Sequence, residues 1–235
     1  MIAHRWLNTM NIKKAHIDSL NLMSESFEDL FKSDDYFIET IKARGVFSPA
    51  RYKAEFGQKL KRNLSEVKVV HSLSGISVPL KRLANNNQMQ IIEFAGLSGY
   101  LEKSILLQKL FKSVSVEMKD SLISRIDICL DYSRIPSIAT KNLNANRIAF
   151  KYKGKGTTIY FKSKCEAKNN PYYDVKIYNH SLKNGLAANI QRIEFCFKKS
   201  FIGDVMLKDI ESIYPKIEKA ILKASGLSVK IVMFL

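Results

Sequence analysis

Apolar and polar residues alternate over several short stretches of the chain, which is the pattern of strands with one buried face. The stretches with this alternation, or with a short apolar run, are residues 16–22, 67–71, 76–78, 88–95, 125–132, 147–152, 157–163, 173–178 and 192–198. Gly75 separates the second stretch from the third, so these two are predicted to form a hairpin. The sequence therefore predicts many short strands joined by tight connections.

Helical spacing of apolar residues occurs in three segments, at residues 27–41, 100–111 and 205–224. Ser98 is the expected N-cap of the second segment. In the third, one stripe carries Ile210, Ile213, Ile217 and Ile221. We expect an α+β fold, with a mostly antiparallel central sheet and helices packed on one face. No low-complexity linker interrupts the chain, so residues 1–235 are expected to form one domain, of which residues 1–60 could be a semi-independent lobe.

The charge balance points to the kind of partner that the protein binds. The chain has 38 Lys and Arg against 22 Asp and Glu, a formal net charge of +16. Such a charge favours a polyanionic partner, although the composition of an AT-rich genome would also raise the lysine content. No segment combines a basic face with a sustained apolar one, so a membrane is not an expected partner.

The cysteines and the N-terminal sequence predict the compartment. Cys129, Cys165 and Cys196 have no C-x-x-C spacing, and the first residues have no apolar run of the secretory type. We expect reduced thiols and a soluble, cytoplasmic protein.

Two predicted strands share the pattern arginine, apolar residue, acid. Because side chains alternate along a strand, Arg125, Asp127 and Asp131 share one face, and Arg192 and Glu194 share a face of the other strand. If the strands are neighbours, both acids project from one open surface, where Asp127 and Glu194 would hold Mg²⁺ or Mn²⁺. Asp131 is about 13 Å further along a regular strand and would join them only at a bulge. The alternative is that the arginines simply pair with the acids across strands.

Tyr160 and Tyr178 are the candidate nucleophiles, since each lies in a predicted strand beside a lysine, Lys162 or Lys176. A phenol has a reference pKa near 10, so it attacks phosphorus only with help from a base or cation. The alternative is that both tyrosines have no chemical role and either pack in the core or lie on the surface.

Basic and aromatic residues near these strands are the expected contacts with nucleic acid. Residues 153–158 lack the P-loop spacing and are predicted to form a lysine-bearing hairpin turn. The four histidines have neither zinc-hydrolase nor paired-histidine spacing. The candidate phosphate contacts are Arg125, Lys153, Lys155, Lys162, Lys176, Arg192 and Lys198, and the tyrosines are suited to stacking on unpaired bases.

In order along the chain, these segments resemble the replication initiation factor family of rolling-circle plasmid initiators, filamentous-phage replication proteins and related mobilisation nickases. The resemblance covers residues 88–198. It rests on the glycine-ended strand IIEFAGLSG (91–99), SRIDICLD (124–131), TTIYF (157–161), VKIYNH (175–180) and RIE (192–194). Each piece is short, and their order carries the resemblance.

The resemblance implies an enzyme that cuts one DNA strand at an origin by tyrosine attack, retains a 5′-phosphotyrosyl bond and leaves a free 3′-OH. It implies a divalent metal, Mg²⁺ or Mn²⁺, that polarises the phosphate, and a host helicase or polymerase as further partners. Tyr178 is then the first choice of nucleophile and Tyr160 the alternative. The chain departs from the family pattern at Lys162, in place of glycine, and at Asn179 and His180, in place of Glu-Lys; His180 is the candidate substitute base or ligand. A noncatalytic single-stranded-DNA-binding or origin-binding protein of the same fold is the alternative function.

Overall fold

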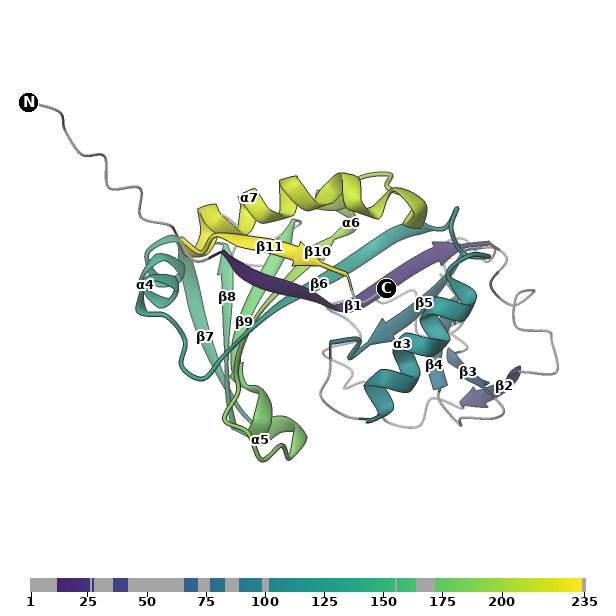
Figure 1. The fold of residues 1–235 in the computed structure, drawn as a ribbon, viewed down its shortest axis with the longest axis horizontal. Coiled ribbons are helices and arrows are strands. Elements are labelled where there is room, and N and C mark those ends of the chain that lie inside the picture. The colour runs from purple at the N-terminus through teal and green to yellow at the C-terminus, as the bar shows by residue number, and fades with distance from the viewer. Residues whose placement is uncertain are drawn as a thin grey trace, which may run out of the picture. The chain divides into compact units, whose positions relative to one another are not determined.

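The computed structural model describes residues 12–25, 27, 36–41, 66–71, 77–82, 89–98, 102–154, 156–163 and 172–233. Its strands are β1 (Lys13–Ser24), β2 (Tyr36–Ile41), β3 (Glu66–His71), β4 (Ser77–Arg82), β5 (Gln90–Ala95), β6 (Leu122–Tyr132), β7 (Arg147–Gly154), β8 (Gly156–Ser163), β9 (Tyr173–Asn179), β10 (Gln191–Lys198) and β11 (Val229–Val232). Its helices are α3 (Glu102–Val114), α4 (Ser137–Asn146), α5 (His180–Asn184), α6 (Lys199–Ile202), the 3₁₀ helix η2 (Leu207–Ile213) and α7 (Tyr214–Ser225). These elements confirm the predicted α+β class (Figure 1).

The described residues divide into two compact units. The first contains the start of β1 up to His16, together with Ile128–Phe195 and Ser212–Met233. The second contains the described parts of Ile17–Asp127 and Cys196–Glu211. Strands β1, β6 and β10 each contribute residues to both units.

In the second unit, hydrogen-bonded neighbours follow the order β2, β3, β4, β5, β1, β6. The pairs from β2 to β1 are antiparallel, with Leu20 opposite Phe94 where β1 meets β5. Helix α3 packs its apolar stripe on this sheet, because Phe111 meets Phe94 edge to face with ring centroids 4.9 Å apart and both rings are fully buried. A core of this kind forms because the apolar residues of α3 recur every three or four positions.

In the first unit, the strand order is β6, β10, β9, β8, β7, and the start of β1 pairs in parallel with β11. Figure 1 shows α7 lying along β11, and α4 packs against α7. Gly226 ends α7 with φ of 74°, and a Cβ there would come within 2.5 Å of the Asn142 side chain of α4. The glycine therefore satisfies both a left-handed cap and a close approach between helices.

Most predicted strands are confirmed with bounds shifted by a few residues. The hairpin between residues 67 and 78 forms from antiparallel β3 and β4, and residues 147–163 form the antiparallel hairpin β7–β8. Helix α3 is described from Glu102, and residues 99–101 lie outside the described residues, so the predicted N-cap at Ser98 stays a prediction. The Ser98 hydroxyl donates a 2.6 Å hydrogen bond to Asp18.

Two helix predictions need correction. Residues 28–35 lie outside the described residues, but Tyr36–Ile41 is strand β2, since its aromatic and β-branched residues suit a pleated surface. The segment at 205–224 is not one helix: η2 ends at Ile213 and α7 starts at Tyr214, with Pro215 in its first turn. Proline lacks an N–H and is tolerated at a helix start, so it favours a new beginning there. The predicted stripe is nevertheless buried, from Ile210 to Ile221.

The predicted N-terminal lobe falls largely on residues outside the described ones and stays a prediction. Within the described part of the chain, no helix has the length and apolar character needed to cross a membrane.

Candidate functional site

Tyr178 and Glu194 form the centre of the candidate site in the first unit. The Tyr178 hydroxyl donates a 2.8 Å hydrogen bond to Glu194 Oε2. Lys176 lies two residues before Tyr178 on β9, so both side chains project from the same face, and its Nζ lies 2.6 Å from Glu194 Oε1. The two oxygens of one carboxylate are thus held by two side chains of the neighbouring strand β9.

Glu194 is kept as an anion although it is only 2% exposed. Burial acts to raise the pKa of Glu194, but the ion pair and hydrogen bond from Lys176, the hydrogen bond from Tyr178 and the charge of Arg192 outweigh it. The pKa therefore lies below its ordinary value of 4.5. A buried anion is stable here because its lone pairs are satisfied.

Asp131 is engaged by Arg192 rather than standing beside Glu194 as a third acid. Arg192 Nε and Nη2 donate to the two carboxylate oxygens at 2.7 and 2.8 Å. The Arg192 side chain is 1% exposed, so it does not reach a surface where it would contact DNA. Arg192 therefore pairs with an acid across strands, but with Asp131 and not with Asp127 or Glu194.

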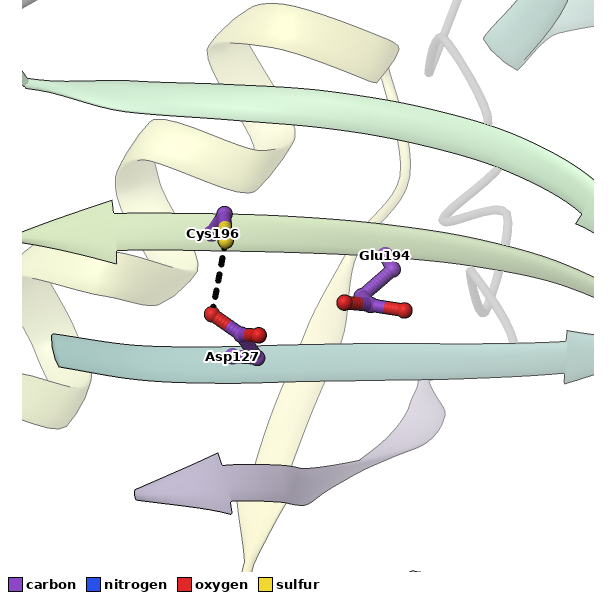
Figure 2. Close-up of side chains that lie close together, drawn as sticks. All are labelled: Asp127, Glu194 and Cys196. Atoms are coloured by element: carbon purple, nitrogen blue, oxygen red, sulfur yellow. Dashed lines mark hydrogen bonds between the residues drawn. The ribbon is translucent and has the colours of Figure 1, made fainter. Parts of the chain in front are cut away.

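Asp127 is held in the second unit by Arg125 and Cys196. Arg125 lies two residues away on the same strand and donates to both carboxylate oxygens at 2.8 and 2.7 Å. The Cys196 thiol donates to Asp127 Oδ1 at 2.8 Å, as Figure 2 shows. Arg125 therefore pairs with an acid along its strand, not across strands.

Asp127, Glu194 and Cys196 each offer a ligand atom, and these atoms lie within 4.8 Å of one another (Figure 2). The two carboxylates suit a hard cation such as Mg²⁺ or Mn²⁺, whereas a thiol is a softer ligand. The expectation that both acids stand on an open surface is wrong, because each is 2% exposed.

A hollow of about 390 Å³ lies beside Tyr178 in the first unit, and we call it the tyrosine pocket. Its lining residues are Tyr152, Gly156, Thr157, Thr158, Tyr160, Tyr178, Asn179 and Lys183. Both predicted nucleophiles, Tyr160 and Tyr178, therefore line the same hollow.

The tyrosine pocket arises from a large–small–large row across three strands. Thr158 of β8 pairs with Tyr152 of β7 on one side and with Tyr178 of β9 on the other. Residues directly opposite one another in a sheet share a face, so the short Thr158 side chain lies between two rings. At the end of the hairpin, Gly156 has φ of 98°, and a Cβ there would come within 2.8 Å of Leu182 in α5.

Helix α5 brings a second lysine to Tyr178. The helix starts because the Asn179 side chain accepts a hydrogen bond from the Leu182 N–H, and Gly185 ends it in the left-handed region. Lys183 Nζ then lies 4.8 Å from the centre of the Tyr178 ring, close enough for a cation–π contact. His180 is 7% exposed, with its ring centre 6.0 Å from that of Tyr178.

The sheet face around the pocket carries exposed aromatic and basic side chains. Phe150 is 48% exposed, Tyr152 64% and Tyr160 39%. Lys162 lies over the Phe150 ring with Nζ 5.6 Å from its centre. This combination is the surface chemistry of proteins that bind single-stranded nucleic acid.

No protein-family model matches the chain, and no curated protein matches it. Among solved structures, the chain is similar to the rolling circle replication initiator protein from Geobacillus stearothermophilus, with a TM-score of 0.45 and 12% identity. The similarity covers 90% of this chain and 85% of that chain. The functional interpretation therefore rests on the residues of this chain.

Three further lysines were predicted to contact phosphate, and the two of them that the structure describes are not among the residues that line the tyrosine pocket. Lys153 is exposed at the end of β7, and Lys198 ends β10 with a half-buried side chain. Lys155 lies outside the described residues.

Tyr152 and Lys183 are among the pocket residues that sequence reasoning did not name as candidates. Tyr152 follows from the hairpin register, which is symmetrical about residue 155 and places it opposite Thr158. The position of Lys183 in the pocket depends on helix α5, which has five residues. The local sequence signals for this helix are its capping residues, Asn179 and Gly185.

Proposed function

We propose that the chain binds single-stranded DNA on the exposed face of β7, β8 and β9 and cleaves the strand by attack of Tyr178 on a backbone phosphate. The observation that carries the proposal is the hydrogen bond from Tyr178 to a buried, anionic Glu194, beside a pocket that Lys183 also lines. A phenol next to a carboxylate acceptor and ammonium groups is an arrangement that activates a nucleophile.

In the proposed step, the Tyr178 Oη–phosphorus bond forms as the bond from phosphorus to the 3′ oxygen breaks. The phenol proton passes to Glu194 Oε2 along the existing hydrogen bond, and the departing 3′ oxygen takes a proton from water. The products are a 5′-phosphotyrosyl bond and a free 3′-OH. No oxidant or nucleotide cofactor is needed, because one phosphoester replaces another.

The lysines have separate roles in this step. Lys176 fixes the carboxylate through Oε1 and so leaves Oε2 directed at Tyr178. Lys183, over the ring, favours the negative charge that develops on the phenol oxygen and the phosphate.

Asp127 and Glu194 are the residues that would hold Mg²⁺ or Mn²⁺. Such an ion would neutralise charge on the phosphate oxygens. The proton transfer and the phenol attack proposed above are assigned to this chain's own residues.

A nick with a free 3′-OH provides a primer for a polymerase. We therefore propose initiation of rolling-circle replication at an origin as the biological role, with a host helicase or polymerase acting afterwards. The net charge of +16 supports a DNA partner, since each lysine or arginine that meets a phosphate releases counterions.

Binding of single-stranded DNA without cleavage is the second candidate function. It is favoured by the burial of Tyr178, which is 5% exposed, and by the double engagement of Glu194. In that case Tyr178 would serve as a wall of the pocket and as a partner that satisfies a buried carboxylate.

The two functions are separated by incubating the purified chain with supercoiled DNA of the element that encodes it, in Mg²⁺ or Mn²⁺, and comparing Tyr178→Phe with Tyr160→Phe. We expect nicked DNA and a covalent protein–DNA adduct with wild type and Tyr160→Phe, and neither with Tyr178→Phe. If the adduct is lost only in Tyr160→Phe, the nucleophile is Tyr160 and not Tyr178. Binding with no adduct under either metal would establish the noncatalytic function.

A further inference from the structure

We propose that the tyrosine pocket is a subsite for one unpaired nucleobase of the bound DNA strand, next to the phosphate that Tyr178 attacks. The inference rests on the proposed function and assigns to the pocket the recognition of a single nucleotide. It is carried by the shape of the hollow and by the chemistry of its walls.

The shape of the pocket suits a flat ring. Tyr152 and Tyr178 lie on the outer two of three adjacent strands, so their backbones are separated by two strand spacings, roughly 9–10 Å. Between them Thr158 has a short side chain, which leaves the space above it open. The row therefore forms a slot with aromatic walls and a small floor.

The size of the pocket suits a nucleotide-sized ligand rather than a water molecule or a protein side chain. Its volume of about 390 Å³ falls in the roughly 300–1,000 Å³ range of small-ligand sites. Helix α5 bounds one side through Asn179 and Lys183. Close packing of Leu182 on Gly156 holds the helix against the hairpin end.

The chemistry of the walls favours a base attached to a phosphate. Three tyrosines offer ring faces for stacking, two threonines offer hydroxyl groups, and Lys183 offers a cation. Among the described residues that line the hollow none carries a carboxylate, so a cationic ligand finds no counter-charge there. An apolar ligand would leave the lysine and hydroxyls without partners.

The position of the pocket ties base recognition to cleavage. The Tyr178 ring is a wall of the slot while its hydroxyl points to Glu194. A base held against this ring would keep its own backbone phosphate within the reach of Lys183 and close to the phenol. The subsite would therefore fix which phosphodiester of a flexible strand meets the nucleophile.

The test uses a dinucleotide probe that is too short to span the whole sheet face. 2-Aminopurine linked to thymidine by one phosphate is titrated with the full chain, and quenching of its fluorescence reports stacking on an aromatic ring. Tyr152→Leu removes the exposed ring, and Tyr152→Phe keeps it. Tyr172→Leu is the matched control, because Tyr172 is also exposed but does not line the pocket.

We expect quenching with wild type, Tyr152→Phe and Tyr172→Leu, and a loss of quenching with about tenfold weaker binding for Tyr152→Leu. Circular dichroism checks that the variant is folded, which is expected because Tyr152 is 64% exposed. An abasic dinucleotide that competes as well as the intact one would overturn the proposal, since the pocket would then hold only phosphate. Equal or tighter binding of the ribonucleotide analogue would overturn the assignment to DNA.

The adduct assay separates this inference from the proposed function. Base-dependent dinucleotide binding without any adduct would refute cleavage and keep the subsite. A normal yield of adduct in Tyr152→Leu, with no base-dependent binding in wild type, would refute the subsite and keep cleavage.

Discussion

The hydroxyl of Tyr178 donates to Glu194 Oε2 across 2.8 Å, while Lys176 holds the other carboxylate oxygen at 2.6 Å. One buried acid thus has both oxygens occupied by residues spaced two apart on a single strand. The hydrogen bond between Tyr178 and Glu194 stabilises the buried carboxylate. In the proposed cleavage, the phenol would lose its proton along the same hydrogen bond.

Removal of the phenol oxygen should affect stability only modestly and cleavage completely. Tyr178→Phe keeps the ring in the pocket but deletes one hydrogen bond to Glu194, which should cost about 1–3 kcal/mol of unfolding free energy. Chemical denaturation measures this loss, and the adduct assay measures cleavage. An adduct that persists in the folded variant would rule out Tyr178 as nucleophile.

Glu194→Gln should alter the dependence of stability on pH. Because the folded pKa of Glu194 lies below 4.5, the unfolded chain takes up this proton first as pH falls. The stabilisation by the ionised group is therefore fully present above about pH 4.5 and is lost as pH falls through the lower folded pKa.

The difference in unfolding free energy between wild type and Glu194→Gln should accordingly be constant near neutrality and shrink below pH 4.5. Urea titrations at a series of pH values measure it. Tyr214→Phe is the control, since it removes a hydroxyl that contacts the Met233 sulfur and no group that titrates in this range. A difference that grows on acidification would contradict the assignment of Glu194 as a stabilising anion.

Asp131→Asn should destabilise the fold more than an exposed acid does. The substitution removes the carboxylate charge that pairs with the buried Arg192 guanidinium, a loss of about 3–5 kcal/mol for a broken buried pair. Asp204→Asn breaks the exposed pair with Lys199 and should leave the melting temperature unchanged. If the two variants melt alike, the Arg192–Asp131 pair is not a structural element.

Lys183→Gln should weaken binding of single-stranded DNA and reduce its salt dependence. Loss of one phosphate contact lowers the slope of log affinity against log salt by about 0.7. Lys219→Gln, on the exposed side of α7, should leave the slope unchanged. Fluorescence anisotropy over a salt series measures both, and equal slopes would place Lys183 outside the DNA-binding surface.

The strand pattern could be predicted because alternation is local, and even the pocket row follows once the β7–β8 turn is centred on residue 155. The sequence did not allow us to predict which charged side chains pair with one another. Arg125 pairs with Asp127 along its own strand, Arg192 with Asp131, and Glu194 with Lys176. These choices depend on side-chain reach and burial, which a one-dimensional pattern of charges does not contain.

Helix breaks were harder to predict than strands. The apolar stripe from Ile210 to Ile221 continues through a 3₁₀ turn into α7, so periodicity alone joined two elements that Pro215 separates. The segment Tyr36–Ile41 was predicted to be helical from its periodicity, but it is a strand, and its β-branched and aromatic residues suit one.

The spacing of Lys176 and Tyr178 also acts as a register lock. A slip of β9 by one residue would turn both side chains to the opposite face and leave the Glu194 carboxylate buried without either partner. Misregistered chains would therefore carry an unpaired buried charge, so the residues that would cut DNA also select the one strand alignment in which they can do so.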